Sequence, residues 1–342
     1  MRQILTWMAA ALILAASGGL ALAQDEAEKE VTKQTTRQIS SAVIGRVFTE
    51  ESEATAAPFN VWSTSSYNSI TVHVPGVGNV SGTTPGSVAA PPNFQVNLYE
   101  EVLGIDTRRG PFVLGASVAA SYTDAGQGGF QQNFPFGSTT VGSTNLEGGS
   151  WTFSPYAAYV LNRNIFFAGV LGYTYGANWA RTGSSTTNLA AFPPFVPAMT
   201  ITQPGAKSSS SSNTLFTDIS ANGIYPVPGT ALSLSGRVGT RYYYGWTSSN
   251  TGPSTGAGAI ALYTAIEARY TIESLQPYAR VQYEYTIPVG PGGSIKTNDV
   301  FLGAGVDYVF SKSLVAGLDF MIQQGEPAVQ NWQLALNIRA TF

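Results

Sequence analysis

Cysteine is absent from this sequence, and histidine occurs only once. Without cysteine the chain forms no disulfides and offers no thiolate to a metal. Hydrolases commonly need a histidine to activate a nucleophile or a water molecule. The single histidine, His73, precedes a long loop, and no serine or carboxylate pattern connects to it. We therefore interpret His73 as a solvated strand end and expect no enzymatic activity, no metal site and no cofactor.

Charged residues are scarce as well, at 11% of the 342 residues, against about a quarter in soluble proteins. After residue 23, however, no stretch reaches the roughly 18 apolar residues of a membrane-spanning helix. A chain that enters lipid without such helices must close a β-barrel, because only a closed barrel satisfies its backbone hydrogen bonds there. The chain has 17 basic and 20 acidic residues, a balance that does not favour nucleic acid as a partner.

The first residues are typical of a secretory signal peptide. A short positive start precedes an apolar run over residues 4–22, which ends in the A-x-A pattern of residues 21–23. We expect export through the Sec pathway and removal of residues 1–23. The alternative, an N-terminal membrane anchor, is disfavoured because the apolar core is short and is interrupted by Ser17-Gly18-Gly19.

Residues 24–57 are expected to hold a short polar segment followed by a helix over about residues 31–48. Ile39, Val43 and Val47 recur every four residues, which is the spacing of one helix face. The other positions are mostly polar and carry three cations: Lys33, Arg37 and Arg46.

From residue 58 onward the hydrophobic period falls to two, as in strands with one apolar and one polar face. The last segment shows this alternation best, with Gln333, Asn337 and Arg339 on the polar face. Its apolar face is formed by Trp332, Leu334, Leu336, Ile338, Ala340 and Phe342. We interpret that face, ending in an aromatic residue, as the signal for the outer-membrane assembly machinery.

Twelve such segments predict that residues 58–342 form an all-β fold, a 12-stranded antiparallel transmembrane outer-membrane β-barrel. They lie near residues 59–74, 94–107, 111–123, 150–161, 165–180, 214–225, 231–248, 260–271, 277–288, 299–310, 314–324 and 330–342. Short turns alternate with long connections rich in Gly, Ser, Thr and Pro, notably residues 75–93, 124–149 and 181–213. In such barrels the short turns face the periplasm. In the second segment the alternation breaks at residues 100–103, which predicts a bulge or a later start.

Several of these segments resemble the C-terminal translocator domain of autotransporters (type V secretion), over about residues 38–342. They are the helix residues 38–42, a first strand at 59–63, and the segments 154–161, 275–285, 302–308 and 332–334. The resemblance implies a twelve-stranded barrel with a helix threaded through its pore. In that family the helix links to an N-terminal passenger carried to the cell surface. Here the segment ahead of the helix covers only about residues 24–36, so we expect a vestigial passenger.

Inside such a barrel, the helix cations could pair with inward acids of the wall and so fix the helix as a plug. The acids in question are Glu267, Glu284, Asp307 and Asp319. Alternatively, these charges simply line a wet lumen.

The resemblance favours a barrel of the bacterial outer membrane that displays or translocates its N-terminal segment. The expected partners are outer-membrane lipid, the β-barrel assembly machinery and periplasmic chaperones, with the chain acting as a monomer. An alternative is a stand-alone surface barrel that acts in adhesion or ligand binding through its long loops. A narrow porin is less favoured, because the helix would fill the lumen.

Overall fold

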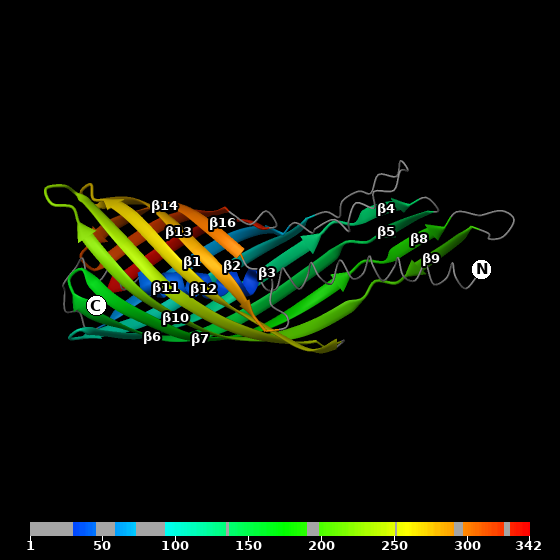
Figure 1. The fold of residues 1–342 in the computed structure, drawn as a ribbon, viewed down its shortest axis with the longest axis horizontal. Coiled ribbons are helices and arrows are strands. Elements are labelled where there is room, and N and C mark those ends of the chain that lie inside the picture. The colour runs from blue at the N-terminus through cyan, green and yellow to red at the C-terminus, as the bar shows by residue number, and fades with distance from the viewer. Residues whose placement is uncertain are drawn as a thin grey trace.

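The structure, a computed structural model, describes residues 30–45, 59–72, 93–134, 137–189, 198–249, 252–290, 297–324 and 329–342. The predicted signal peptide, Arg46 and His73 lie outside these ranges. Twelve strands close into one antiparallel barrel (Figure 1), which confirms the predicted fold. They are β1 (Asn60–Val72), β2 (Phe94–Arg109), β3 (Phe112–Gln127), β6 (Thr144–Asn162), β7 (Ile165–Thr182), β10 (Lys207–Pro226), β11 (Leu232–Ser249), β12 (Gly252–Tyr270), β13 (Leu275–Val289), β14 (Thr297–Ser311), β15 (Leu314–Gln324) and β16 (Val329–Thr341).

The barrel closes where its first strand meets its last. β1 pairs with β16 in one unbroken register, from Asn60 opposite Thr341 to Val72 opposite Val329. On its other side β1 pairs equally continuously with β2. No strand of the barrel therefore presents a free edge to lipid, where an unpaired backbone would be costly.

The second strand departs from the prediction of a bulge or a later start. β2 runs without interruption through residues 100–103 and pairs continuously with both neighbours. The apparent break arises because Glu101 occupies an outward position, between the exposed Tyr99 and Leu103. Hydroxyl groups of two β1 residues hold its carboxylate there: Ser63 Oγ donates to Glu101 Oε1 over 2.7 Å, and Ser65 donates to Oε2.

Two of the predicted long loops are largely strand. β6 and β10 begin well before the predicted residues, and the connections carry four short strands of their own. These are β4 (Phe130–Phe134), β5 (Gly137–Val141), β8 (Ser185–Leu189) and β9 (Met199–Gln203), which form a second sheet in the order β4-β5-β8-β9 (Figure 1). β5 and β8 come from different connections, so their pairing could not be deduced from either segment alone. We call this end of the barrel the long-loop end and the opposite end the short-turn end.

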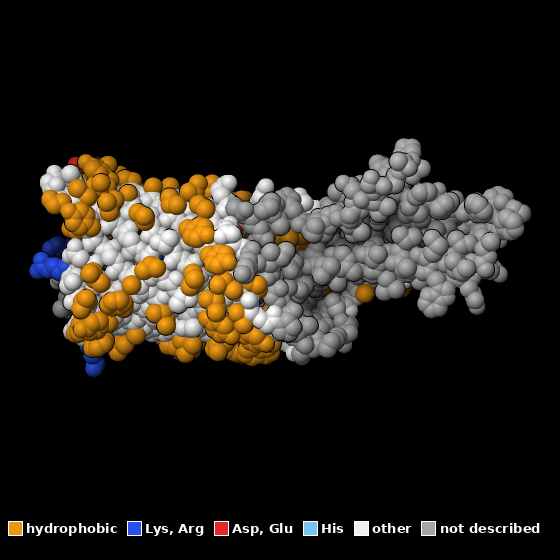
Figure 2. Space-filling model, in the orientation of Figure 1, with side chains coloured by type: hydrophobic (Ala, Val, Ile, Leu, Met, Phe, Trp, Pro, Cys, Tyr) orange, Lys and Arg blue, Asp and Glu red, His pale blue; other side chains and the backbone are white. Residues whose placement is uncertain are grey.

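Apolar side chains are spread over the outer surface of the barrel and gather toward its two ends (Figure 2). Ile219, Val238 and Ile266 are each about 60% exposed, as expected for side chains that face lipid rather than water. Aromatic side chains lie near both ends, as interface girdles do. Examples are Tyr99, Tyr122 and Trp151 toward the long-loop end, and Tyr270, Phe310 and Phe342 at the short-turn end. Of the predicted assembly signal, Trp332, Leu334, Leu336 and Ile338 are exposed on β16, as is Phe342 directly after it; their recognition by the assembly machinery stays a prediction.

A helix over residues 30–45 lies inside the barrel (Figure 1). It begins one residue before the predicted range, and residues 46–48 lie outside the described part of the chain. Within the described residues, no helix combines the length and apolar character needed to span a membrane. The lumen helix is instead surrounded by inward-facing strand residues, and it defines the candidate functional site.

Candidate functional site

The direction of the lumen helix follows from what its two ends contact. Val31, near its N-terminal end, packs against a cluster at the long-loop ends of the strands, which includes Val72, Phe94 and Val329. Ile44, near its other end, belongs to a cluster that includes Phe166 beside a short turn. The chain therefore enters the helix from the long-loop end and leaves it toward the short-turn end.

The half of the helix nearer the short-turn end is held by apolar packing. Ile39, Val43 and Ile44 are at most 1% exposed. They pack against inward side chains that include Trp62, Tyr156, Phe166 and Phe216. Burying each of the three aliphatic side chains contributes about 1.5–3 kcal/mol. This part of the lumen is a hydrophobic core, so the alternative of a uniformly wet lumen does not describe it.

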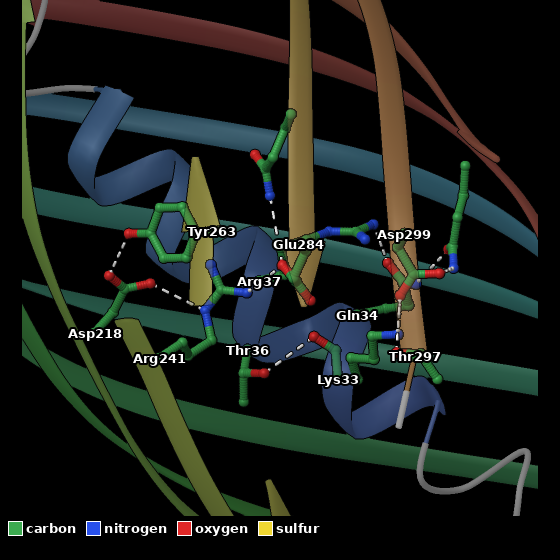
Figure 3. A network of polar contacts seen from close by, with 12 residues as sticks. Lys33, Gln34, Thr36, Arg37, Asp218, Arg241, Tyr263, Glu284, Thr297 and Asp299 are labelled. Atoms are coloured by element: carbon green, nitrogen blue, oxygen red, sulfur yellow. Dashed lines mark hydrogen bonds and ion pairs between the residues drawn. The ribbon is translucent and has the colours of Figure 1, made fainter. Parts of the chain in front are cut away.

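The other half of the helix is tied to the wall by buried polar contacts (Figure 3). Lys33 Nζ lies 2.8 Å from Asp299 Oδ2 on β14, and both side chains are buried. Gln323 on β15 donates to the second oxygen of Asp299 over 2.9 Å. Gln34 donates in turn to Gln323 over 3.2 Å. The helix is thus fixed in rotation and depth against two adjacent strands.

The sequence of the barrel wall explains why Asp299 needs a cation from the helix, Lys33. Asp299 lies directly opposite Glu284 in the pairing of β14 with β13, and like charges in opposite positions destabilise a sheet. Arg241 on β11 lies 3.4 Å from Glu284 and 3.0 Å from Asp218 (Figure 3). Arg241, a residue of the barrel wall, therefore balances the charge of Glu284, whereas the charge of Asp299 is balanced by Lys33 of the helix.

Arg37 contacts the wall without an ion pair to any described residue. Its guanidinium carbon lies 4.0 Å from the centroid of the Phe301 ring on β14, and its Nη2 donates to Gln34. The side chain is only 2% exposed. A cation over an aromatic face gains about 2 kcal/mol when it is desolvated. Arg37 thus gives the helix a second contact with β14, one helical turn after Lys33.

The predicted partners of the helix cations need correction. Lys33 pairs with Asp299, which the prediction did not include, and Arg37 pairs with none of the four predicted acids. Each of those acids has a nearer arginine of the barrel wall: Arg241 for Glu284, Arg269 for Glu267 and Asp307, and Arg280 for Asp319. Arg46 lies outside the described residues, so its pairing stays a prediction.

One of these wall pairs depends on a glycine that sequence reasoning missed. Arg280 on β13 reaches across β14 to Asp319 on β15. It passes over Gly303, where a Cβ atom would lie 2.8 Å from Arg280 Nε. A glycine opposite a long inward side chain indicates such a crossing, but the two residues can be matched only when the register between the strands is known.

A small cavity remains between the helix and the opposite wall. Its volume is about 110 Å³, which is room for a few water molecules. Hydroxyl-bearing side chains line it, including Thr32, Thr35 and Thr36 of the helix and Ser121, Ser150 and Thr214 of the wall. Apolar side chains such as Val31, Leu146 and Trp246 line it as well, and the cavity is far too small for a second polypeptide segment.

Comparison with solved structures agrees with this architecture. The chain is similar to the translocator domain of the autotransporter NalP from Neisseria meningitidis, with a TM-score of 0.61 and 10% identity, over 90% of this chain and 98% of that one. It is also similar to the transport unit of the autotransporter AIDA-I from Escherichia coli, with a TM-score of 0.53 and 12% identity, over 87% and 98% of the two chains. No protein-family model matches the chain, and no curated protein matches it significantly in sequence. The fold is that of an outer-membrane β-barrel of the autotransporter type, as the resemblance in the sequence implied.

Proposed function

We propose that this protein is a translocator-type barrel of the bacterial outer membrane that displays a short N-terminal segment at the cell surface. One observation carries the proposal: the N-terminal end of the lumen helix lies at the long-loop end, where Val31 packs against Phe94 and Val329. Short turns of outer-membrane barrels face the periplasm, so the long-loop end faces outward. A segment ahead of residue 30 would therefore emerge toward the cell surface.

The packing of the lumen helix supports display rather than diffusion through an open pore. Its apolar half is buried in a core, and its polar half is tied to β14 by Lys33 and Arg37. A helix held at both ends is suited to anchor a segment after it has crossed the membrane. The proposal therefore assigns the helix the role of a permanent plug and tether, without catalysis or a cofactor.

The proposal also includes a route and partners. Residues 1–23 direct export through the Sec pathway, and periplasmic chaperones carry the unfolded chain to the barrel assembly machinery. The outward face of β16, with Phe342 directly after it, supplies the recognised signal; its large apolar side chains and Phe342 are 41–73% exposed. The folded chain then resides in outer-membrane lipid as a monomer, a state supported by the closed pairing of β1 with β16.

A second candidate function is adhesion through the sheet beyond the membrane. One face of this sheet carries neutral polar side chains from three strands: Ser138, Thr140, Thr186, Asn188, Thr200 and Thr202. Thr200 donates to Asn188 over 2.8 Å, which orders part of this face. An ordered neutral surface offers hydrogen bonds without charge repulsion, which is suited to uncharged polar partners such as glycans. Binding of cells or glycans that disappears when this sheet is deleted would favour this function.

An epitope tag inserted after Gln24 tests the display proposal directly. On intact cells we expect antibody binding to the tag and its removal by external protease. The matched control is the same tag inserted after Arg109, in the short turn between β2 and β3, which should stay inaccessible until the outer membrane is breached. If both tags become accessible only after breaching, the N-terminal segment is periplasmic and the proposal fails.

A further inference from the structure

Four buried polar side chains of the lumen have oxygen atoms that lack hydrogen-bond partners within the described part of the chain. They are Gln38 of the helix, Asn68 on β1, Glu100 on β2 and Gln333 on β16; we call them the oxygen cluster. Their exposed fractions are 6%, 0%, 3% and 7%. The unpartnered atoms include both carboxylate oxygens of Glu100, Asn68 Oδ1, Gln38 Oε1 and Gln333 Oε1.

Strand register brings these groups to one patch of the lumen. Asn68 lies directly opposite Gln333 in the pairing of β1 with β16. Glu100 lies opposite Ser66, one diagonal step from Asn68, and such diagonal neighbours are about 7–8 Å apart and within reach of long side chains. Gln38 Nε2 donates to Ser66 Oγ over 2.7 Å, so the helix amide lies over the same strand position.

The charge of Glu100 makes this patch unusual. An unpaired carboxylate in a buried site is strongly unfavourable, because it loses its hydration without gaining a partner. Three cations of the described lumen pair with other acids: Lys33 with Asp299, Arg241 with Glu284, and Arg280 with Asp319. Arg37 lies over the Phe301 ring on β14 instead. Within the described residues no ion pair involves Glu100, and a cation taken up from solution would supply the compensating charge.

We infer that the oxygen cluster binds a hard cation of the size of Ca²⁺ or Na⁺. One carboxylate and several amide oxygens are ligands of the kind that Ca²⁺ takes in flexible sites, at about 2.3–2.6 Å. Mg²⁺ fits less well, because it demands near-ideal octahedral geometry and loses its waters reluctantly. A bound ion would join the helix, through Gln38, to β1, β2 and β16. It would fix the helix to the seam at which the barrel closes.

Unfolding of the purified full-length protein in detergent micelles tests this inference. Bound cation is removed with a chelator, and the thermal midpoint is measured in CaCl₂, NaCl or choline chloride at equal ionic strength. A site filled at about a hundredfold excess over Kd should raise the midpoint by roughly 5 °C. The rise should occur with Ca²⁺ or Na⁺ but not with choline, and the more effective ion identifies the ligand. Equilibrium dialysis with radioactive Ca²⁺ or Na⁺ should find about one ion per chain.

Two neighbouring glutamates provide a matched pair of variants. Glu100→Gln removes the buried charge without changing shape, and should abolish both the rise and the bound ion. Glu101→Gln changes the adjacent, outward-facing residue and should retain both. A second ligand variant, Gln38→Met, should weaken binding about tenfold, the effect of losing roughly 1.4 kcal/mol; it tests the site even if Glu100→Gln does not fold.

Three results would overturn the inference. The midpoint of the unaltered protein could be the same in all three salts. Glu101→Gln could lose the response along with Glu100→Gln. Gln38→Met could bind the ion as tightly as the unaltered protein. Surface display of the N-terminal segment is not required for any of these measurements, so failure here leaves the proposed function standing.

Discussion

Deleting residues 30–45 should convert a closed barrel into an open pore, with single-channel conductance in planar lipid bilayers several times that of the full chain. Eight-stranded barrels are filled by their own side chains, whereas 16-stranded barrels leave an aqueous channel. A 12-stranded barrel lies between these sizes, and here the helix with Ile39, Val43 and Ile44 fills the centre. The barrel should still fold, because the pairing of β1 with β16 does not involve the helix.

The matched control deletes residues 24–29, directly ahead of the helix, and should leave the conductance low. Both variants should show the heat-modifiable electrophoretic shift of a folded barrel, so that a change in conductance is not confused with misfolding. If the two deletions conduct alike, the helix does not block the pore, and its assignment as a plug is wrong.

The barrel itself could be predicted from sequence because its signal is local and repeated. On β16 each outward position from Trp332 to Ala340 is apolar, and the structure follows that alternation up to Ile338. Glu101 shows the limit of this reasoning. A charged residue at a lipid-facing position looks like a break in the pattern, and only the register with β1 reveals the serine hydroxyls that hold it.

The partners in the lumen could not be predicted for a related reason. The helical spacing placed Lys33 and Arg37 outside the apolar face of the helix, but their partners depend on how deeply the helix is inserted and how it is rotated. Asp299 was overlooked because it lies near the end of its strand, where the sequence gives no indication that the helix passes it. The second sheet could not be predicted either, because β5 and β8 belong to separate connections and their pairing depends on how these lie in space.

Replacing Asp299 with alanine should destabilise the folded protein by about 3–5 kcal/mol, the usual effect of removing one partner from a buried ion pair. Lys33 would keep only Glu30, 3.7 Å away, as an ion-pair partner within the described residues. Its charge would otherwise be buried against β14, where Gln323 would also lose its acceptor. The measurement is the free energy of unfolding in urea, in lipid vesicles or detergent, compared with that of the unaltered chain.

Two further variants separate charge from other causes. Lys312→Ala removes a cation from the exposed turn after β14 and should change stability by no more than about 0.5 kcal/mol. The double variant Lys33→Met with Asp299→Leu removes both charges and keeps apolar volume. It should recover most of the lost stability, because well-packed apolar residues often replace a buried ion pair without penalty. If Asp299→Ala behaves like Lys312→Ala, the contact between Lys33 and Asp299 does not hold the helix. The apolar half around Ile39 would then be its main anchor.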